Sequence, residues 1–111
     1  MIKQINYSYD SEADAIFIKL TSEKADITAE LTEHILIDFT NEGKIFGIEI
    51  LDASEELSKL FDRSVDKKEI KKFLCQIDQD AKDQYLVQFK APKTNERATL
   101  LIPVYKSPLL S

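Results

Sequence analysis

The 111-residue chain has little of several features that would point to a compartment or a class of protein. Its single cysteine, Cys75, cannot form a disulfide within the chain, so we expect the reducing cytoplasm as its compartment. No apolar run approaches the roughly 18 residues that a membrane-spanning helix needs, and Met1–Asn6 have no apolar signal-peptide core. With two glycines, three prolines and no low-complexity stretch, the chain has no recognisable linker. We therefore expect one domain over residues 1–111, with no membrane contact.

The chain does have charge, and its distribution is uneven. Twenty Asp and Glu against fifteen Lys and Arg give a net charge of −5, which makes a general nucleic-acid binder improbable. Residues 1–60 hold thirteen acids and five bases, whereas residues 61–111 hold seven acids and ten bases. This asymmetry predicts an acidic surface that binds a basic protein, or a basic C-terminal surface used in dimerisation. The alternative is two solvated surfaces of different composition.

Strands dominate the predicted secondary structure. Apolar residues alternate with polar ones in the N-terminal half, which predicts five strands near residues 5–9, 16–20, 27–31, 35–39 and 46–50. Pairing Phe39 with Phe46 in the last hairpin gives one apolar face and places Asp38 opposite Gly47. Gly43 would supply a positive φ in the turn between these strands.

A main helix is predicted over about 52–62, with Asp52 as N-cap, Glu55 completing a capping box and an apolar stripe packed on the sheet. Residues 66–80 fit either a helix or a strand, and we expect a short helix near 66–71 that begins with another cap pattern at Asp66, followed by a strand. Two more strands near 85–91 and 98–104 flank a polar turn, with Pro103 at a sheet edge or strand end. The predicted fold is α+β: mostly antiparallel β-sheet, with seven to eight strands.

Two segments carry a resemblance: Tyr9-Asp10-Ser11-Glu12-Ala13-Asp14-Ala15 and Gly47-Ile48-Glu49-Ile50-Leu51-Asp52-Ala53-Ser54. Together they resemble a small prokaryotic family of uncharacterised domains with a YD-x-EADA opening and a GIEILDAS close, over about residues 7–54. The resemblance implies a compact domain of antiparallel strands followed by a helix, and it implies no chemistry. Some members are thought to be encoded beside small toxin-like proteins, which implies an antitoxin-like or accessory role. Residues 66–111 form a basic, strand-rich C-terminal extension beyond it.

The motif residues also have structural interpretations. Asp10 suits an Asx turn, Ala13 and Ala15 permit close packing, and Gly47 indicates a bulge or a close backbone approach. These interpretations lower the need for a chemical role.

Acidic residues supply two candidate chemical sites. Asp10, Glu12 and Asp14 have the oxygen ligands that a hard cation prefers, although a solvated turn explains them more simply. Asp38 and Glu49 would share one face of a hairpin, which permits the proximity that an acid–base pair needs. The simpler interpretation is that both are ordinary surface residues of the strand ladder. We expect no metal and no cofactor.

Three further sets of residues are candidates for a nucleophile, a zinc site or a phosphate-binding surface. Cys75 is in phase with buried positions, and His34 has no second histidine in the chain, so neither predicts a nucleophile or a zinc site. Basic residues gather in a first cluster and around the last hairpin, where they could contact phosphate: Lys67, Lys68, Lys71 and Lys72, then Lys90, Lys93 and Arg97. Interspersed acids argue against nucleic acid.

The function that we expect is that of a small non-enzymatic protein-binding or regulatory module, antitoxin-like and homodimeric through a sheet edge. Its partner would be a basic, toxin-like protein, and we expect no catalytic residue. The candidate contacts are Asp10, Glu12, Asp14, Lys67, Lys68, Lys71 and Lys72. The alternative is a small enzyme or metal-binding protein that uses the acidic face, formed by Asp10, Glu12, Asp14, Asp38 and Glu49.

Overall fold

The computed structural model describes residues 2–42, 44–78 and 84–103, and the chain divides into two compact units. Tyr7–Ala53 form a five-stranded unit. The described residues of 2–6 and 54–103 form a four-stranded unit that also holds most of helix α1 and all of α2. Both sheets are antiparallel, which confirms the predicted α+β class. Neither described helix is long and apolar enough to span a membrane.

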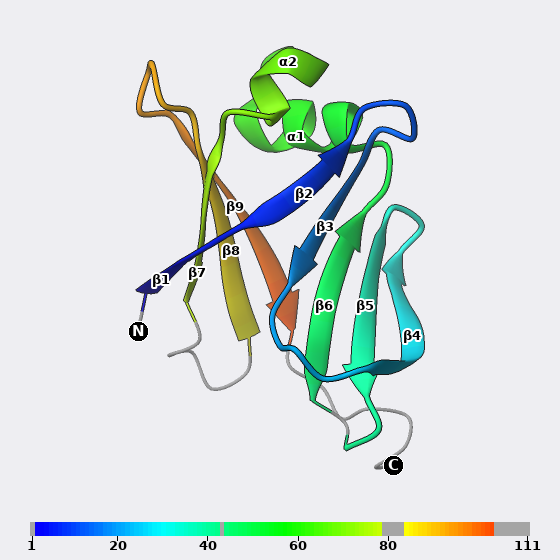
Figure 1. Ribbon diagram of the computed structural model, residues 1–111. Coiled ribbons are helices and arrows are strands. Elements are labelled where there is room, and N and C mark those ends of the chain that lie inside the picture. The colour runs from blue at the N-terminus through cyan, green and yellow to red at the C-terminus, as the bar shows by residue number, and fades with distance from the viewer. Residues whose placement is uncertain (1, 43, 79–83, 104–111) are drawn as a thin grey trace. The chain divides into compact units, whose positions relative to one another are not determined.

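The five-stranded sheet has the order β2-β3-β6-β5-β4 (Figure 1). Its strands are β2 (Tyr7–Asp10), β3 (Ala15–Lys19), β4 (Ala25–Thr32), β5 (Ile35–Thr40) and β6 (Ile45–Ile50). One face is almost wholly apolar, and its buried side chains are Ile16, Ile18, Ile35, Ile37, Phe39, Ile48 and Ile50. The period-two pattern of the sequence produces this face, because alternate residues of a strand point to the same side.

The predicted register of the β5–β6 hairpin is correct for most of its length and wrong at its closed end. Ile37 pairs with Ile48 and Asp38 with Gly47, as expected. Phe39, however, pairs with Ile45 and not with Phe46, because the register shifts between Asp38 and Phe39. The backbone N–H of Thr40 donates to the Lys44 carbonyl at 2.7 Å, which closes a shorter turn and leaves an extra residue in β6. The predicted role of Gly43 lies outside the described residues.

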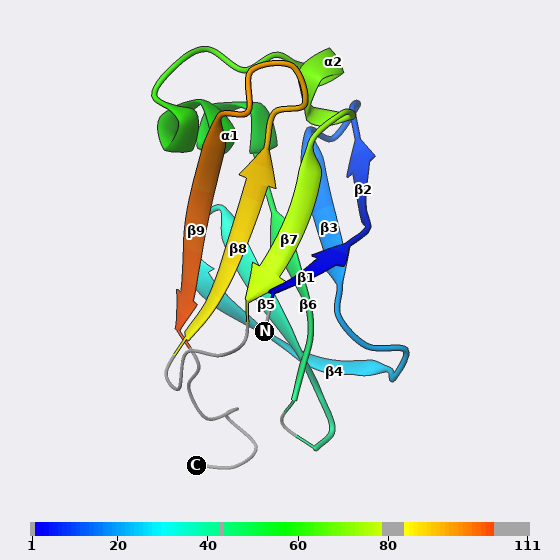
Figure 2. The same cartoon turned by 90° about the vertical axis from the view of Figure 1, so that its left-hand side faces the viewer.

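The four-stranded sheet has the order β1-β7-β8-β9 and is seen face on in Figure 2. Its strands are β1 (Ile2–Ile5), β7 (Leu74–Asp78), β8 (Gln84–Lys90) and β9 (Arg97–Pro103). The described chain therefore has nine strands and not seven or eight. The run predicted as one strand at 5–9 divides at Asn6, so β1 and β2 belong to different sheets. Pro103 ends the edge strand β9, as predicted.

The two helices lie at the end of the four-stranded sheet that carries the β8–β9 turn (Figures 1 and 2). Helix α1 (Ala53–Phe61) closely follows the predicted range of 52–62. Its last residue, Phe61, stacks on Phe73 at a centroid distance of 5.0 Å, and Phe73 contacts Phe89 of β8 at 6.3 Å. These aromatic contacts attach the helix to the end of the sheet.

In the ambiguous segment 66–80, helix α2 (Lys67–Ile70) is followed by β7, as predicted, and residues 79–80 lie outside the described residues. Asp66 is the N-cap, and its carboxylate accepts the Glu69 N–H at 2.8 Å. The predicted N-cap of α1 is wrong. Asp52 has a φ of 50°, not the extended backbone of an N-cap, and its carboxylate contacts a histidine.

Candidate functional site

The β2–β3 turn holds the acidic residues of the first family-like motif. The Asp10 carboxylate accepts the backbone N–H groups of Glu12 and Ala13 at 3.0 and 3.2 Å, which confirms the predicted Asx turn. Asp14 has a φ of 52°, a conformation that aspartate tolerates better than most residues. Its carboxylate accepts the Tyr9 hydroxyl at 2.6 Å, and burial together with this bond raises the pKa of Tyr9. Two of the three acids are therefore engaged by the turn itself.

The two motifs meet at one end of the five-stranded sheet. The Ala53 N–H donates to the Asp14 carbonyl at 2.8 Å, and the Leu51 N–H donates to the His34 carbonyl at 2.7 Å. His34 Nδ1 lies 2.9 Å from the Asp52 carboxylate. The motif residues thus connect the β2–β3 turn, the β4–β5 turn and the start of α1. These contacts give the motif residues an architectural role in this unit.

The acids of the β2–β3 turn were one candidate for a metal site. Over the described residues, no three His, Cys, Asp or Glu side chains gather closely enough to hold a metal ion. Glu12 is exposed at the tip of the turn, whereas Asp10 and Asp14 bind backbone and tyrosine donors. The geometry of the turn therefore does not supply a set of convergent oxygen ligands.

The face of the five-stranded sheet opposite the buried isoleucines carries the predicted carboxyl pair. Asp38 is 5% exposed and accepts the Thr28 hydroxyl at 2.5 Å. Burial raises the pKa of Glu49, and a hydrogen bond and charge repulsion from Asp38 raise it further. The expected proximity of Asp38 and Glu49 is confirmed by their hydrogen bond.

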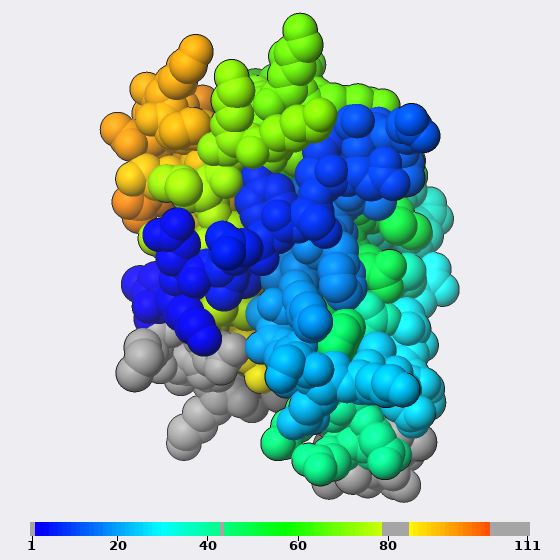
Figure 3. All heavy atoms as spheres, viewed as in Figure 1, coloured from blue at the N-terminus to red at the C-terminus, as the bar shows by residue number. Residues whose placement is uncertain are grey.

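The same polar face continues onto the edge strand β4. Asp26 and Glu30 of β4 are exposed, and neither forms an ion pair among the described residues. Residues 7–53 hold eleven acids and three bases, so few cations are present to neutralise them. The space-filling view shows the side of the molecule on which β2, β3 and β4 contribute surface (Figure 3). The five-stranded unit therefore has a large excess of acids and an exposed acidic edge at β4.

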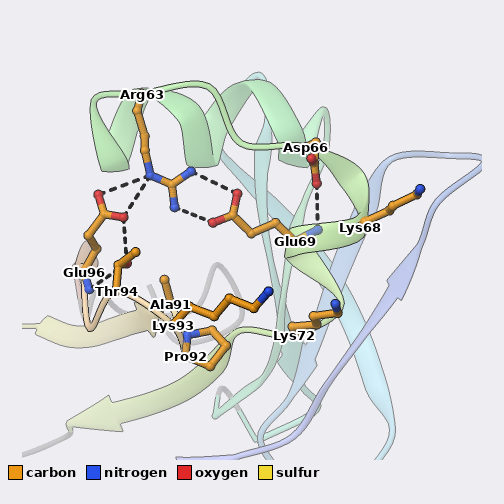
Figure 4. Close-up of a pocket in the computed structure, with 10 residues that line it drawn as sticks. All are labelled: Arg63, Asp66, Lys68, Glu69, Lys72, Ala91, Pro92, Lys93, Thr94 and Glu96. Atoms are coloured by element: carbon orange, nitrogen blue, oxygen red, sulfur yellow. Dashed lines mark hydrogen bonds and ion pairs between the residues drawn. The ribbon is translucent and has the colours of Figure 1, made fainter.

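A cavity of about 490 Å³ opens in the four-stranded unit, between α2 and the β8–β9 turn. Arg63 lies at its rim (Figure 4). Its Nε donates to Glu96 at 3.0 Å and its Nη1 to Glu69 at 2.9 Å, while Nη2 also contacts Glu69. The Thr94 hydroxyl donates to Glu96 at 2.8 Å. Both carboxylates stabilise the charged guanidinium and raise the pKa of Arg63. This network ties α2 to the turn and was not predicted, because Glu96 is distant in sequence from Arg63 and Glu69.

Three lysines line the cavity: Lys68 and Lys72, which were predicted as contacts, and Lys93 from the β8–β9 turn. Lys93 extends from the turn toward Lys72, whereas Lys68 points away from the cavity (Figure 4). Lys71 is exposed and does not line it. The acids and the lysines that we predicted as one contact set therefore fall in different units.

Cys75 is 1% exposed in β7, and burial raises the pKa of its thiol to about 12. It behaves as the buried small residue that its phase with Phe73 and Ile77 predicted. The basic residues Lys90 and Arg97 lie opposite each other where β8 ends and β9 begins, next to the β8–β9 turn.

The comparisons with known proteins concern the five-stranded unit. Residues 6–54, the DUF2283 segment, match the family described as "Protein of unknown function (DUF2283)". The DUF2283 match confirms the resemblance drawn from the two motifs and nearly coincides with Tyr7–Ala53, the five-stranded unit. No curated protein and no solved structure gave a match. The lysine-lined cavity lies outside the DUF2283 segment, among residues 63–96.

Proposed function

We propose that this protein is a non-enzymatic binding module whose DUF2283 segment binds a basic protein through the β4 edge. The observation that supports the proposal is the pair of exposed acids on that edge, Asp26 and Glu30, neither of which forms an ion pair among the described residues. An edge strand presents unpaired backbone groups that a partner strand can bind, and its side chains select the partner. An antitoxin-like role, in which the partner is a small basic toxin, is the form of this function that the family resemblance suggests.

The charge pattern of β4 favours a different chain over a second copy. If two β4 strands paired antiparallel about Thr28, Asp26 of each copy would lie opposite Glu30 of the other. Like charges directly opposite one another destabilise a strand pair. A partner strand with lysine or arginine at these positions would convert both repulsions into attractions, and its positive charge would speed association with the acidic face.

The acids of the β2–β3 turn and the Asp38–Glu49 pair favour binding over catalysis. Asp10 and Asp14 serve the fold of the β2–β3 turn, and Asp52 contacts His34. Asp38 and Glu49 lie on a sheet face, and neither lines the cavity between α2 and the β8–β9 turn. The acids that remain for a surface contact include Asp26 and Glu30 of β4, which are exposed.

Homodimerisation is also part of the proposal, and β9 is the edge that suits it. Antiparallel pairing of two β9 strands about Leu100 would place Ala98 opposite Ile102 and Thr99 opposite Leu101, with no like charges in contact. Leu101 is 54% exposed. Sedimentation velocity over a range of protein concentrations should show the mass of a dimer, and a monomer at every concentration would contradict this part of the proposal.

The β4 proposal is tested by co-purification from the native cell with the variant Asp26→Asn/Glu30→Gln. The matched control is Glu55→Gln/Asp62→Asn, which removes two exposed acids from the four-stranded unit. We expect one basic protein in stoichiometric amount with the wild type and the control, and its loss with the β4 variant. Equal retention by all three proteins, or an acidic partner, would contradict the proposal.

A further inference from the structure

The cavity between α2 and the β8–β9 turn lies in the four-stranded unit, so it can be considered apart from the acidic surface of the DUF2283 segment. Its volume of about 490 Å³ falls within the range typical of small-molecule sites, about 300–1,000 Å³. It is too small to accept a folded protein. Ala91 and Pro92 supply apolar lining beside the charged residues.

The acids around the cavity are already engaged. Glu69 and Glu96 both bind Arg63, and Asp66 caps α2 through the Glu69 N–H. The guanidinium of Arg63 is bound on both sides in return, so it serves as a structural support and not as a free cation (Figure 4).

The lysines are not engaged. The side chains of Lys68, Lys72 and Lys93 form no ion pair or hydrogen bond among the residues that the structure describes. Lys72 follows α2 and Lys93 lies in the β8–β9 turn, so they approach the cavity from two elements that the Arg63 network holds together. An anion between the two ammonium groups would neutralise charges that have no ion-pair partner among the described residues.

We propose that this cavity binds a small organic molecule carrying two or more phosphate groups, with Lys72 and Lys93 as its principal contacts. Lysine binds phosphate as a compact point charge with three donors. Two uncompensated lysines match a ligand with at least two negative charges. The apolar lining from Ala91 and Pro92 would contact the organic part of the ligand.

Isothermal titration calorimetry of the full chain with pyrophosphate and fructose 1,6-bisphosphate tests the proposal. Citrate, a trianion without phosphate, is the ligand control. The variants are Lys72→Gln, Lys93→Gln and the matched control Lys71→Gln, which removes the same charge from a neighbouring exposed lysine that does not line the cavity. Circular dichroism establishes that each variant is folded.

We expect both phosphate ligands to bind, fructose 1,6-bisphosphate more tightly because of its organic part, and citrate to bind at least tenfold more weakly. Loss of Lys72 or Lys93 should weaken binding by about tenfold each, as the loss of a charge-assisted hydrogen bond does. Lys71→Gln should change it less than about twofold. Equal weakening by all three variants would overturn the proposal, because it would indicate diffuse attraction. Absence of binding at millimolar ligand, or citrate bound as tightly as phosphate, would also overturn it.

Discussion

Replacing Gly47 with alanine tests whether a residue of the second motif is required by packing. A Cβ atom at this position would lie 2.7 Å from the Ile18 carbonyl oxygen and 3.2 Å from Cε1 of the Phe17 ring. The first contact is shorter than real Cβ atoms show, and it is made to backbone. Ile18 pairs with Ile48 in the β3–β6 ladder, so its carbonyl cannot move without disturbing those hydrogen bonds.

Two effects of opposite sign decide the magnitude. Alanine in place of glycine in a strand ordinarily stabilises by roughly 0.5–1 kcal/mol, because the unfolded chain loses less freedom on folding. Overpacking of a filled site costs roughly 1–3 kcal/mol. Because the contact is to backbone, we expect the upper part of that range and a net loss of about 1–2 kcal/mol. For a chain of this size, the melting temperature should fall by about 4–8 °C.

The assay is thermal unfolding followed by circular dichroism, with Ser8→Ala as the control on an exposed strand position. The double variant Gly47→Ala/Phe17→Leu separates the two contacts, since it removes the ring but leaves the Ile18 carbonyl. We expect the double variant to have a lower melting temperature than Phe17→Leu alone. An unchanged or raised melting temperature for Gly47→Ala would refute the argument that close backbone approach requires glycine here.

Three other predictions follow from individual contacts. Asp66→Ala removes the N-cap of α2 and should lower the free energy of unfolding by about 1 kcal/mol in urea denaturation. Asp66→Asn should keep most of the wild-type stability, because asparagine is also a good N-cap residue. The pKa of Glu49 is raised in the folded state. The contribution of this residue to the free energy of unfolding is therefore fully present below the pKa that Glu49 has in the unfolded chain, and it is lost as the pH rises through the pKa of the folded state. Glu49→Gln should therefore be more stable than wild type at pH 7 and show a weaker loss of stability over that rise, and equal pH profiles would contradict this. Cys75, with a pKa raised to about 12, should react with a thiol reagent at pH 8 only after denaturant is added, and rapid reaction of the folded protein would contradict its burial.

Sequence patterns predicted those parts of the fold that local physics determines. The isoleucine alternation identified the strands of the DUF2283 segment and one face of its sheet, because period two is visible in the chain itself. The cap pattern at Asp66 placed α2, and β7 followed because β8 and β9 needed a partner. The Asx turn at Asp10 was likewise predictable from one side chain and its two neighbouring N–H groups.

The errors arose where distant segments decide the outcome. No residue pattern near Asn6 indicates that β1 and β2 join different sheets, since β1 pairs with β7, far along the chain, whereas β2 pairs with the neighbouring β3. The shift at Phe39 depends on how the turn closes at Thr40 and Lys44. Asp52 fitted a capping pattern, yet His34 from another turn contacts its carboxylate.

The candidate sites divide in the same way. The charge asymmetry and the nearness of Asp38 to Glu49 were predictable, because both follow from composition and hairpin register. The Arg63–Glu69–Glu96 network and the cavity beside it were not, because they combine an inter-helix loop, a short helix and a hairpin turn. A pair of unpaired lysines facing one cavity has no sequence signature.

Binding of a basic protein by the acidic β4 edge of the DUF2283 segment can be measured directly as the affinity of the purified complex at several salt concentrations. For the wild type, the dissociation constant should rise steeply with salt, since attraction between exposed charges is screened. Asp26→Asn/Glu30→Gln should bind at least tenfold more weakly at low salt and show a shallower salt dependence, while Glu55→Gln/Asp62→Asn should match the wild type. A β4 variant with the affinity and salt dependence of the wild type would contradict the claim.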